Sequence, residues 1–317
     1  MGPIAKTLVL SLGILASGAA RLTYEQEFSE DLRKRNLAPA SVDLESWSRM
    51  GQSSLAGTFG GLRTAMAFFV SLSAHGHFQD LEWHELKNDY KLITSLDPYN
   101  SFYWSEGSHH LAFNAASWAR SQRDQPEIQR RTIEREYLEA GDAFLKKGLI
   151  YLPDDGELWA DMARIWSHRL KRPDPERALP AWQEAARLAQ HPIYQRRVFY
   201  TMAQIPGMER EALDYGIKLV KEEPRHLGIP SFQAIYWALF QNPELPIDMQ
   251  KPALTEVFRS EEKAYRQLYN YYFRTSDEGF YAGNIEADLH QLIRDLQIPF
   301  QYNPFLSPRQ RRIPQDF

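Results

Sequence analysis

Apolar residues recur at three- and four-residue spacing along most of this chain, and no segment alternates apolar and polar residues as a half-buried strand does. Prolines separate the periodic segments and mark turns between them. The pattern therefore predicts an all-α protein built from helical hairpins with short connecting loops.

Four segments have the same spacing of apolar or small residues. These residues stand at positions n, n+4 and n+7, and in three of the segments also at n+10. Side chains at this spacing lie on one face of a helix, so each segment is predicted to be the second helix of a hairpin. A proline soon after the stripe, as at Pro98 and Pro153, disfavours helix in the residue before it and ends the element. The stripes consist of Leu86, Tyr90, Ile93 and Leu96; Gly141, Leu145, Gly148 and Tyr151; Ala178, Trp182, Ala185 and Leu188; and Ala212, Gly216 and Leu219.

A short helical phrase also repeats in the middle of the chain. Trp159-x2-Met162-Ala163 returns forty residues later as Phe199-x2-Met202-Ala203. Units of 20 to 50 residues that recur in this way stack on their neighbours because one unit cannot bury its own apolar face. The spacing favours a helical repeat scaffold over an enzyme.

The stretch 157–190 resembles a tetratricopeptide repeat, and the resemblance extends to about residues 80–223. Trp159, Met162, Ala163 and Trp166 match the family's first helix, while the stripe from Ala178 to Leu188 matches its second helix. The chain departs from the family by extra residues in 171–177 and a shortened turn near Pro206. The residues expected to pack helix against helix are Gly57, Gly61, Arg63, Trp159, Ala163, Trp166, Ala178, Trp182 and Ala185.

The resemblance implies a right-handed stack of antiparallel helix pairs, a TPR-like solenoid that serves as an adaptor and has no catalytic residues. First helices line the inner wall of such a stack. Arg164 and Arg197 would make charge-assisted bonds to an extended peptide or a carboxyl terminus, although solvated helix faces would look the same in sequence. The expected wall residues are Glu157, Arg164, Ser167, His168, Arg197, Tyr200 and Gln204.

The N-terminus, residues 1–21, has the pattern of an export signal. A short basic segment ending at Lys6 precedes an apolar run over residues 7–20, and Ser17-Gly18-Ala19 fits a cleavage site. Membrane anchor, cleaved signal and buried helix all remain open, with the anchor favoured. The charge bias predicts a cytoplasmic N-terminus and an extracytoplasmic, periplasmic body.

Residues 22–54 are charged and polar and indicate a connecting arm, which leads into a repeat domain over residues 55–230. The apolar stretch 55–74 opens this domain and carries small residues at Gly57, Gly61 and Ala65. A membrane span there would bury Arg63 at a cost of about 2.5–3.5 kcal/mol. We therefore expect a soluble core helix, with Arg63 paired to a carboxylate or to helix-end carbonyls, ahead of a membrane-surface helix or a second span.

The last third is predicted to form a helical cap, residues 231–298, and an extended Pro/Arg tail, residues 299–317. A wide aromatic stripe at helical spacing would cover the last repeat, because an uncovered apolar face makes a solenoid insoluble. A protein partner or the lipid interface is the alternative contact for this stripe. It consists of Tyr265, Leu268, Tyr269, Tyr272 and Phe273.

Composition removes several classes of function. The chain has 37 basic and 41 acidic residues, a net charge of −4, and therefore lacks the basic excess typical of nucleic-acid binders. With no cysteine, it has no disulfides, thiolate nucleophiles or cysteine-ligated metal sites. Neither a phosphate-binding glycine loop nor a Gly-x-Ser-x-Gly motif occurs.

Histidines are the main feature that suggests an enzyme, beside the aromatic surface. His75, His77 and His84 cluster in sequence and His109 and His110 follow, but residues two apart on a helix point away from each other. We expect turn and surface histidines, with a metal site or acid-base catalysis as minority alternatives, and hence no metal and no cofactor.

The leading hypothesis is a non-enzymatic, membrane-tethered scaffold. It would hold protein subunits of a larger envelope assembly, such as a pilus, secretion or respiratory complex, and bind no nucleic acid. A soluble periplasmic module that binds peptides or glycans is the second hypothesis. A metal-dependent enzyme that uses the five histidines is the third.

Overall fold

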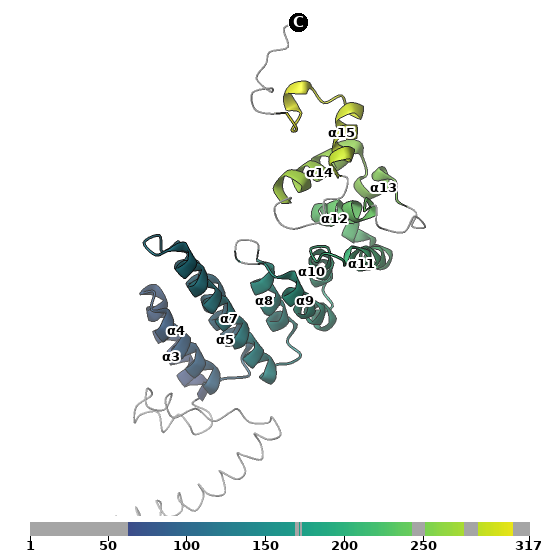
Figure 1. Cartoon of the computed structure of the whole chain (residues 1–317). Coiled ribbons are helices and arrows are strands. Elements are labelled where there is room, and N and C mark those ends of the chain that lie inside the picture. The colour runs from purple at the N-terminus through teal and green to yellow at the C-terminus, as the bar shows by residue number, and fades with distance from the viewer. Residues whose placement is uncertain (1–62, 169–170, 172, 243–250, 276–284, 307–317) are drawn as a thin grey trace, which may run out of the picture. The chain divides into compact units, whose positions relative to one another are not determined.

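The computed structural model describes residues 63–168, 171, 173–242, 251–275 and 285–306 of the 317-residue chain. Within these ranges the secondary structure is helical and contains no strand, so the all-α prediction is confirmed for the described part (Figure 1). The chain divides into two compact units, one ending at Asp154 and the other beginning at Asp155. This boundary falls inside the repeat domain that the sequence predicted over residues 55–230.

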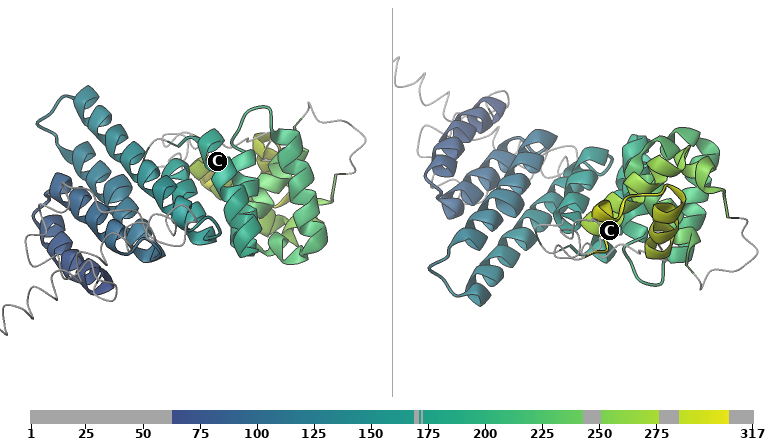
Figure 2. Two further views of the ribbon diagram at one scale, coloured as in Figure 1. Left: turned by 90° about the horizontal axis from the view of Figure 1, so that it is seen from below. Right: turned by 90° about the horizontal axis from the view of Figure 1, so that it is seen from above.

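The first unit contains two hairpins that lie side by side (Figures 1 and 2). One pairs α3 with α4. The other pairs a long helix, formed by α5, the π-helical segment η3 and α6, with α7. Their bounds are α3 Arg63–Gln79, α4 Trp83–Leu96, α5 Ser101–His109, η3 His110–Ala115, α6 Ala116–Ser121 and α7 Glu127–Tyr151.

The α3/α4 hairpin holds together through small residues on α3 and the apolar stripe of α4. Ala67 and Ala74, two turns apart on α3, are buried, and Leu86 and Ile93 of α4 are fully buried. Arg63 donates from Nη2 to the carbonyl oxygen of Ser95 at 2.6 Å, near the C-terminal end of α4. This is the helix-end carbonyl pairing that the sequence suggested for Arg63.

The second hairpin brings α7 unusually close to its partner helix. A Cβ added at Gly141 would lie 2.7 Å from Cβ of Ala112, and one at Gly148 would lie 2.7 Å from Cγ of Trp104. The hydroxyl of Ser108 donates to the carbonyl oxygen of Gly141 at 3.1 Å. The two stripe glycines therefore serve close helix approach, next to the π-helical turn that η3 inserts.

The second unit continues with further hairpins, α8/α9 and α10/α11, followed by a cluster around α12. α8 and α9 pack extensively on one another, and α9 then packs on α10. The bounds are α8 Gly156–Ser167, α9 Pro175–Ala189, α10 Pro192–Met202, α11 Glu209–Glu222, η4 Pro224–Gly228, α12 Pro230–Phe240, α13 Leu254–Phe258, α14 Glu261–Thr275, α15 Ile285–Asp295 and η6 Phe300–Tyr302.

The four predicted second-helix stripes thus lie in α4, α7, α9 and α11. In α8 and α9 the matched residues Ala163, Trp166, Ala178, Trp182 and Ala185 are buried. Trp159, which belongs to the same phrase, is only half-buried. The guanidinium carbon of Arg177 lies 3.4 Å from the centre of the Trp166 ring, so a cation covers this edge of the pair.

Residues 232–239 of α12 are all buried, and they are apolar except for Gln233, which donates to the carbonyl oxygen of Val257. Phe232, Trp237 and Leu239 are nearly inaccessible to solvent. α10, α11 and η4 pack against this helix, as do α13 and α14 from the C-terminal part (Figure 2). A helix without a polar face is stable only when neighbours surround it, which is the position that α12 occupies.

The C-terminal aromatic stripe lies differently from the prediction. The buried row of α14 is Ala264, Leu268 and Tyr271, while Tyr265, Tyr269 and Tyr272 are half-buried and Phe273 is exposed. Helix α14 packs against α12 and α15. The five stripe positions span more of the helix circumference than the neighbours α12, α13 and α15 cover, so only the inner edge of the stripe is enclosed.

The start of the tail is not extended as predicted. Residues 300–302 form a 3-10 turn, and the ring of Phe305 stacks on His290 of α15 with centroids 4.2 Å apart. Phe305 also contacts Phe273, with centroids 5.4 Å apart. Aromatic burial therefore outweighs the extended preference of the prolines here.

The expected core helix in residues 55–74 is buried on one side only. Residues 63–74 belong to α3, whose outer residues Phe68, Phe69 and Leu72 are exposed, because α4 packs on its other side. Gly57 and Gly61, like the predicted anchor 1–21 and arm 22–54, lie outside the described residues. No helix in the described ranges has both the length and the apolar character needed to cross a bilayer.

Candidate partner-binding surface

The residues expected on an inner wall lie on α8, on α10 and just beyond their ends. Asp155 is the N-cap of helix α8, and its Oδ1 accepts hydrogen bonds from the backbone N–H groups of Glu157 at 3.0 Å and Leu158 at 3.1 Å. This cap fixes the first turn. It therefore sets the direction in which Glu157 projects from the helix.

An ion-pair cluster follows on the same face of α8. Arg164 lies 3.5 Å from the Glu157 carboxylate and also pairs with Asp161, since residues three, four and seven apart share a helix face. Arg164 is 43% exposed and Glu157 is 67% exposed. Ion pairs this accessible contribute about 0–1 kcal/mol, so either partner can be exchanged for an external group at little cost.

Tyr194 joins this cluster from α10, and the sequence analysis did not single it out. Its buried ring stacks on Trp182 with centroids 5.9 Å apart, and its hydroxyl donates to Glu157. Burial, assisted by the bond to Glu157, raises the pKa of Tyr194 to about 12. The hydroxyl therefore stays protonated at neutral pH and holds Glu157 in place as a donor.

Further along α10, Arg197 is exposed and Tyr200 is half-buried. The guanidinium carbon of Arg197 is 5.9 Å from the centre of the Trp182 ring. The hydroxyl of Tyr200 lies 2.9 Å from Oγ of Ser231 at the start of α12. Burial raises the pKa of Tyr200 as well. Helix α10 thus bonds to α8 at its first turn and to α12 at its last turns.

The remaining wall residues are less available. The hydroxyl of Ser167 accepts from Nε1 of Trp182 at 2.8 Å and donates to the carbonyl oxygen of Ala163 at 2.8 Å, so both of its bonds are internal. His168 at the C-terminal end of α8 and Gln204 beyond α10 are half-buried. The α8–α10 surface is accordingly defined by Glu157, Asp161, Arg164, Arg197 and Tyr200.

The five histidines do not share one site, although His75 and His109 lie near His110. Nδ1 of His77 is 2.6 Å from Oδ2 of Asp89, and this bond raises the pKa of His77. His110 lies against Phe78 with ring centroids 4.6 Å apart, and burial together with the nearby His109 and His75 lowers its pKa to about 4. His84 is exposed. In the described ranges no group of three or more histidine or acidic side chains is arranged to hold a metal ion.

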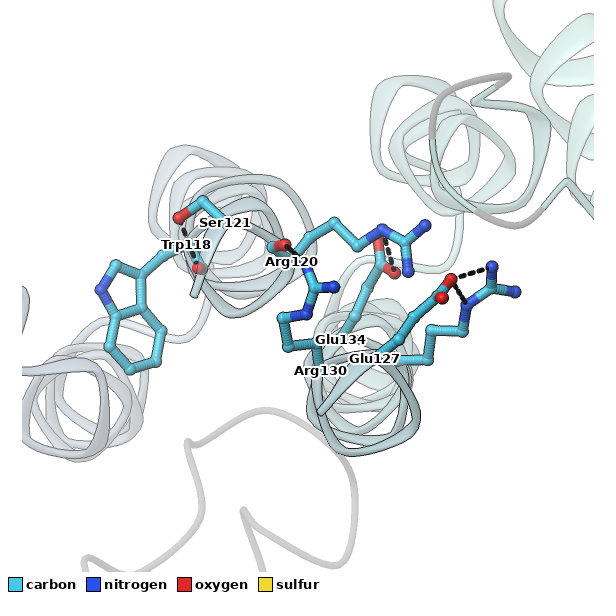
Figure 3. A network of polar contacts seen from close by, with 7 residues as sticks. Trp118, Arg120, Ser121, Glu127, Arg130 and Glu134 are labelled. Carbon is cyan, nitrogen blue, oxygen red and sulfur yellow. Dashed lines mark hydrogen bonds and ion pairs between the residues drawn. The ribbon is translucent and has the colours of Figure 1, made fainter. Parts of the chain in front are cut away.

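A second polar network joins α6 to α7 (Figure 3). Glu134 is only 3% exposed, and its carboxylate lies 3.9 Å from Nε of Arg120. Nη1 of Arg130 donates to the backbone oxygen of Arg120 at 3.1 Å, and Arg131 pairs with Glu127. The hydrogen bond and charge of Arg131 lower the pKa of Glu127. These contacts tie a helix end to the following helix, so we assign them a structural role.

Comparison with known proteins leaves the family of this chain open. No protein-family model matches it, and no curated protein sequence matches it significantly.

The sequence analysis did not name Asp161, although the spacing of charged residues along α8 predicts its place in the cluster. Asp161 lies four residues after Glu157 and three before Arg164, so a helix places the three together. Tyr194 and Ser231 carry no such signal, because their partners Glu157 and Tyr200 are 37 and 31 residues away in sequence. Only the packing of α10 between its neighbours brings them together.

Proposed function

We propose that this protein is a non-enzymatic scaffold, tethered to a membrane by residues 1–21, that binds protein subunits of a larger envelope assembly through the α8–α10 surface. The helix pairs α8/α9 and α10/α11 act as TPR-like units in this proposal. The supporting observation is the chain of contacts from α8 through α10 to α12, which sets exposed arginines, an exposed carboxylate and a half-buried tyrosine on consecutive first helices.

Such a surface is suited to an extended, acidic peptide or a C-terminal carboxylate. Arg164 is held by two carboxylates of its own helix in exposed ion pairs, and a partner carboxylate can replace one of them. Arg197 is exposed near the face of Trp182, and Tyr200 contributes apolar area with a polar end. Glu157 is held by a hydrogen bond from Tyr194, and Tyr200 by a hydrogen bond with Ser231, before a partner arrives.

The test is capture of a partner from cross-linked, solubilised membranes with the full chain. We expect at least one protein at stoichiometric yield with the unaltered chain and its loss with the double variant Arg164→Glu/Arg197→Glu. The matched control Arg187→Glu/Arg210→Glu makes the same charge change on α9 and α11 and should retain the partner.

The double variant places a third carboxylate beside Glu157 and Asp161, so Arg164→Gln/Arg197→Gln provides a version without added repulsion. Circular dichroism should show that all of these variants keep their helices. Absence of any stoichiometric partner, or equal capture by the Arg164/Arg197 variants and the control, would overturn the proposal.

A further inference from the structure

The outer face of α3 is an apolar strip that no described element covers. Phe68 is 54% exposed, Phe69 is 67% exposed and Leu72 is 56% exposed. Ala65 is exposed on the same side, and a Cβ added at Gly76 would meet no atom within 4 Å. With about 100° of rotation per residue, Ala65, Phe69, Leu72 and Gly76 lie roughly opposite the buried Ala67.

The orientation of this strip is fixed by the other side of the helix. Ala67 and Ala74 are buried, and Arg63 is bonded to the carbonyl oxygen of Ser95 on α4. Near its C-terminal end, Phe78 packs against His110 and Trp83. Helix α3 therefore cannot rotate to bury Phe69 without losing these contacts.

The charge pattern of this region differs from that of the rest of the chain. No aspartate or glutamate occurs between Glu45 and Asp80, although the chain contains 41 acidic residues. The only charged residues in between are Arg49 and Arg63. Among the described residues, carboxylates lie near α3 only at its C-terminal end, where Asp80 follows and Asp89 and Glu82 contact His77, so the segment that carries Phe68, Phe69 and Leu72 has no acidic side chain of its own to repel an anionic surface.

We propose that the outer face of α3 lies on the surface of a lipid bilayer, with Phe68, Phe69 and Leu72 entering the boundary between headgroups and acyl chains. An interfacial helix presents large apolar side chains on one face, and anionic headgroups favour a region without carboxylates. The proposal extends the proposed function, since it rests on a membrane tether at residues 1–21. It adds a second contact that orients the first unit on the membrane.

Because the chain has no cysteine, single-cysteine labelling tests this directly in the full chain. Phe69→Cys carries an environment-sensitive fluorophore, and the chain is reconstituted into phosphatidylcholine/phosphatidylglycerol vesicles with brominated acyl chains. We expect a blue-shifted emission and a loss of fluorescence to the brominated lipid. The matched control is Ile128→Cys at the start of α7, which is 78% exposed and lies on the same unit.

The Ile128→Cys label should keep an aqueous emission and resist lipid quenching. A Phe69→Cys label that is blue-shifted but unquenched would show that protein, a second copy or another segment of this chain, covers the strip, and would overturn the lipid assignment. Equal quenching at both positions would do the same. Both sites are exposed, so neither substitution removes a core contact.

Flotation of the vesicles distinguishes failure of the α3 contact from failure of the membrane tether. A chain that floats but leaves the Phe69→Cys label unquenched retains the tether and loses only the α3 contact. A chain that does not float overturns both. Partner capture by the α8–α10 surface is measured separately and is unaffected by either result.

Discussion

Two apolar helices of this protein, α12 and α3, have opposite surroundings. α12 is enclosed by helices on every side, and Phe232 and Leu239 are inaccessible to solvent. α3 is enclosed on one side, and Phe69, a residue of the same type as Phe232, is 67% exposed. Apolar composition alone therefore does not decide burial in this chain. The number of neighbours that the following elements supply decides it.

The difference also shows how each helix is held. α12 has polar contacts with the C-terminal helices, since Oδ2 of Asp288 accepts from Nε1 of Trp237 at 2.7 Å and from Nε2 of Gln241 at 2.6 Å. α3 makes polar contacts with α4 at both of its ends, from Arg63 to the carbonyl oxygen of Ser95 and from His77 to Asp89. These side-chain hydrogen bonds therefore fix α12 against the C-terminal helices and α3 against α4.

The largest expected effect comes from truncating the same side chain on the two helices. Phe232→Ala removes a ring that packs 4.6 Å from that of Phe199 and should destabilise the second unit by about 3–5 kcal/mol. Phe69→Ala should change stability by less than about 0.5 kcal/mol in detergent-free solution. Urea unfolding followed by circular dichroism measures both, and equal losses would remove the contrast between α12 and α3.

A smaller effect should follow from adding volume instead of removing it. Ala163→Leu or Ala185→Leu places extra carbons where both alanines are fully buried and should destabilise the α8/α9 pair by about 1–3 kcal/mol through overpacking. The matched change at an exposed position of α3, Ala65→Leu, should be nearly neutral. Thermal unfolding midpoints would show this, and a stable Ala163→Leu variant would contradict close packing between α8 and α9.

The smallest expected effect concerns pH and the inner side of α3. Burial holds the pKa of His110 at about 4, below the usual value near 6.5, so the unfolded chain binds the extra proton first as pH falls. Stability attributable to His110 is complete above about pH 6.5 and declines as pH falls toward 4. His110→Leu should flatten the dependence of the urea midpoint on pH in this window.

His77 should change stability with pH in the opposite direction to His110. The bond to Asp89 raises the pKa of His77. The contribution of His77 to folding stability is therefore complete below about pH 6.5 and is lost as pH rises through the folded-state pKa. His77→Gln should therefore lower stability more at pH 6 than at pH 8. A His110→Leu variant with an unchanged pH slope would mean that His110 is accessible to protons in the folded protein.

Helical spacing was sufficient to predict the elements that make up most of the fold. The stripes that contain Ile93, Leu145, Ala185 and Leu219 lie in α4, α7, α9 and α11, because residues on one helix face are set by local geometry alone. The same local rule accounts for the Glu157–Asp161–Arg164 cluster. The π-helical turn at η3 had no such signal, since it accompanies the approach of another helix, at Gly141.

The candidate surface was predicted only in part. Glu157, Arg164, Arg197 and Tyr200 follow from the resemblance to a repeat family, which assigns positions on first helices. Their partners Tyr194 and Ser231 depend on how α10 sits between α8 and α12, and that arrangement involves residues distant in sequence. Ser167 shows the reverse case, because Trp182 and Ala163 occupy a hydroxyl that was expected to face a partner.

The amino-acid sequence by itself determined that this protein is helical, where most of its helices lie and which of their faces are apolar, because these follow from propensity and periodicity within a few turns. Tertiary structure decided which apolar faces are covered. Burial depends on neighbours that arrive from elsewhere in the chain, and α12 receives them on all sides whereas the outer face of α3 receives none from the described residues. The exposed strip on α3 and the surface across α8 and α10 both arise from that distribution of neighbours.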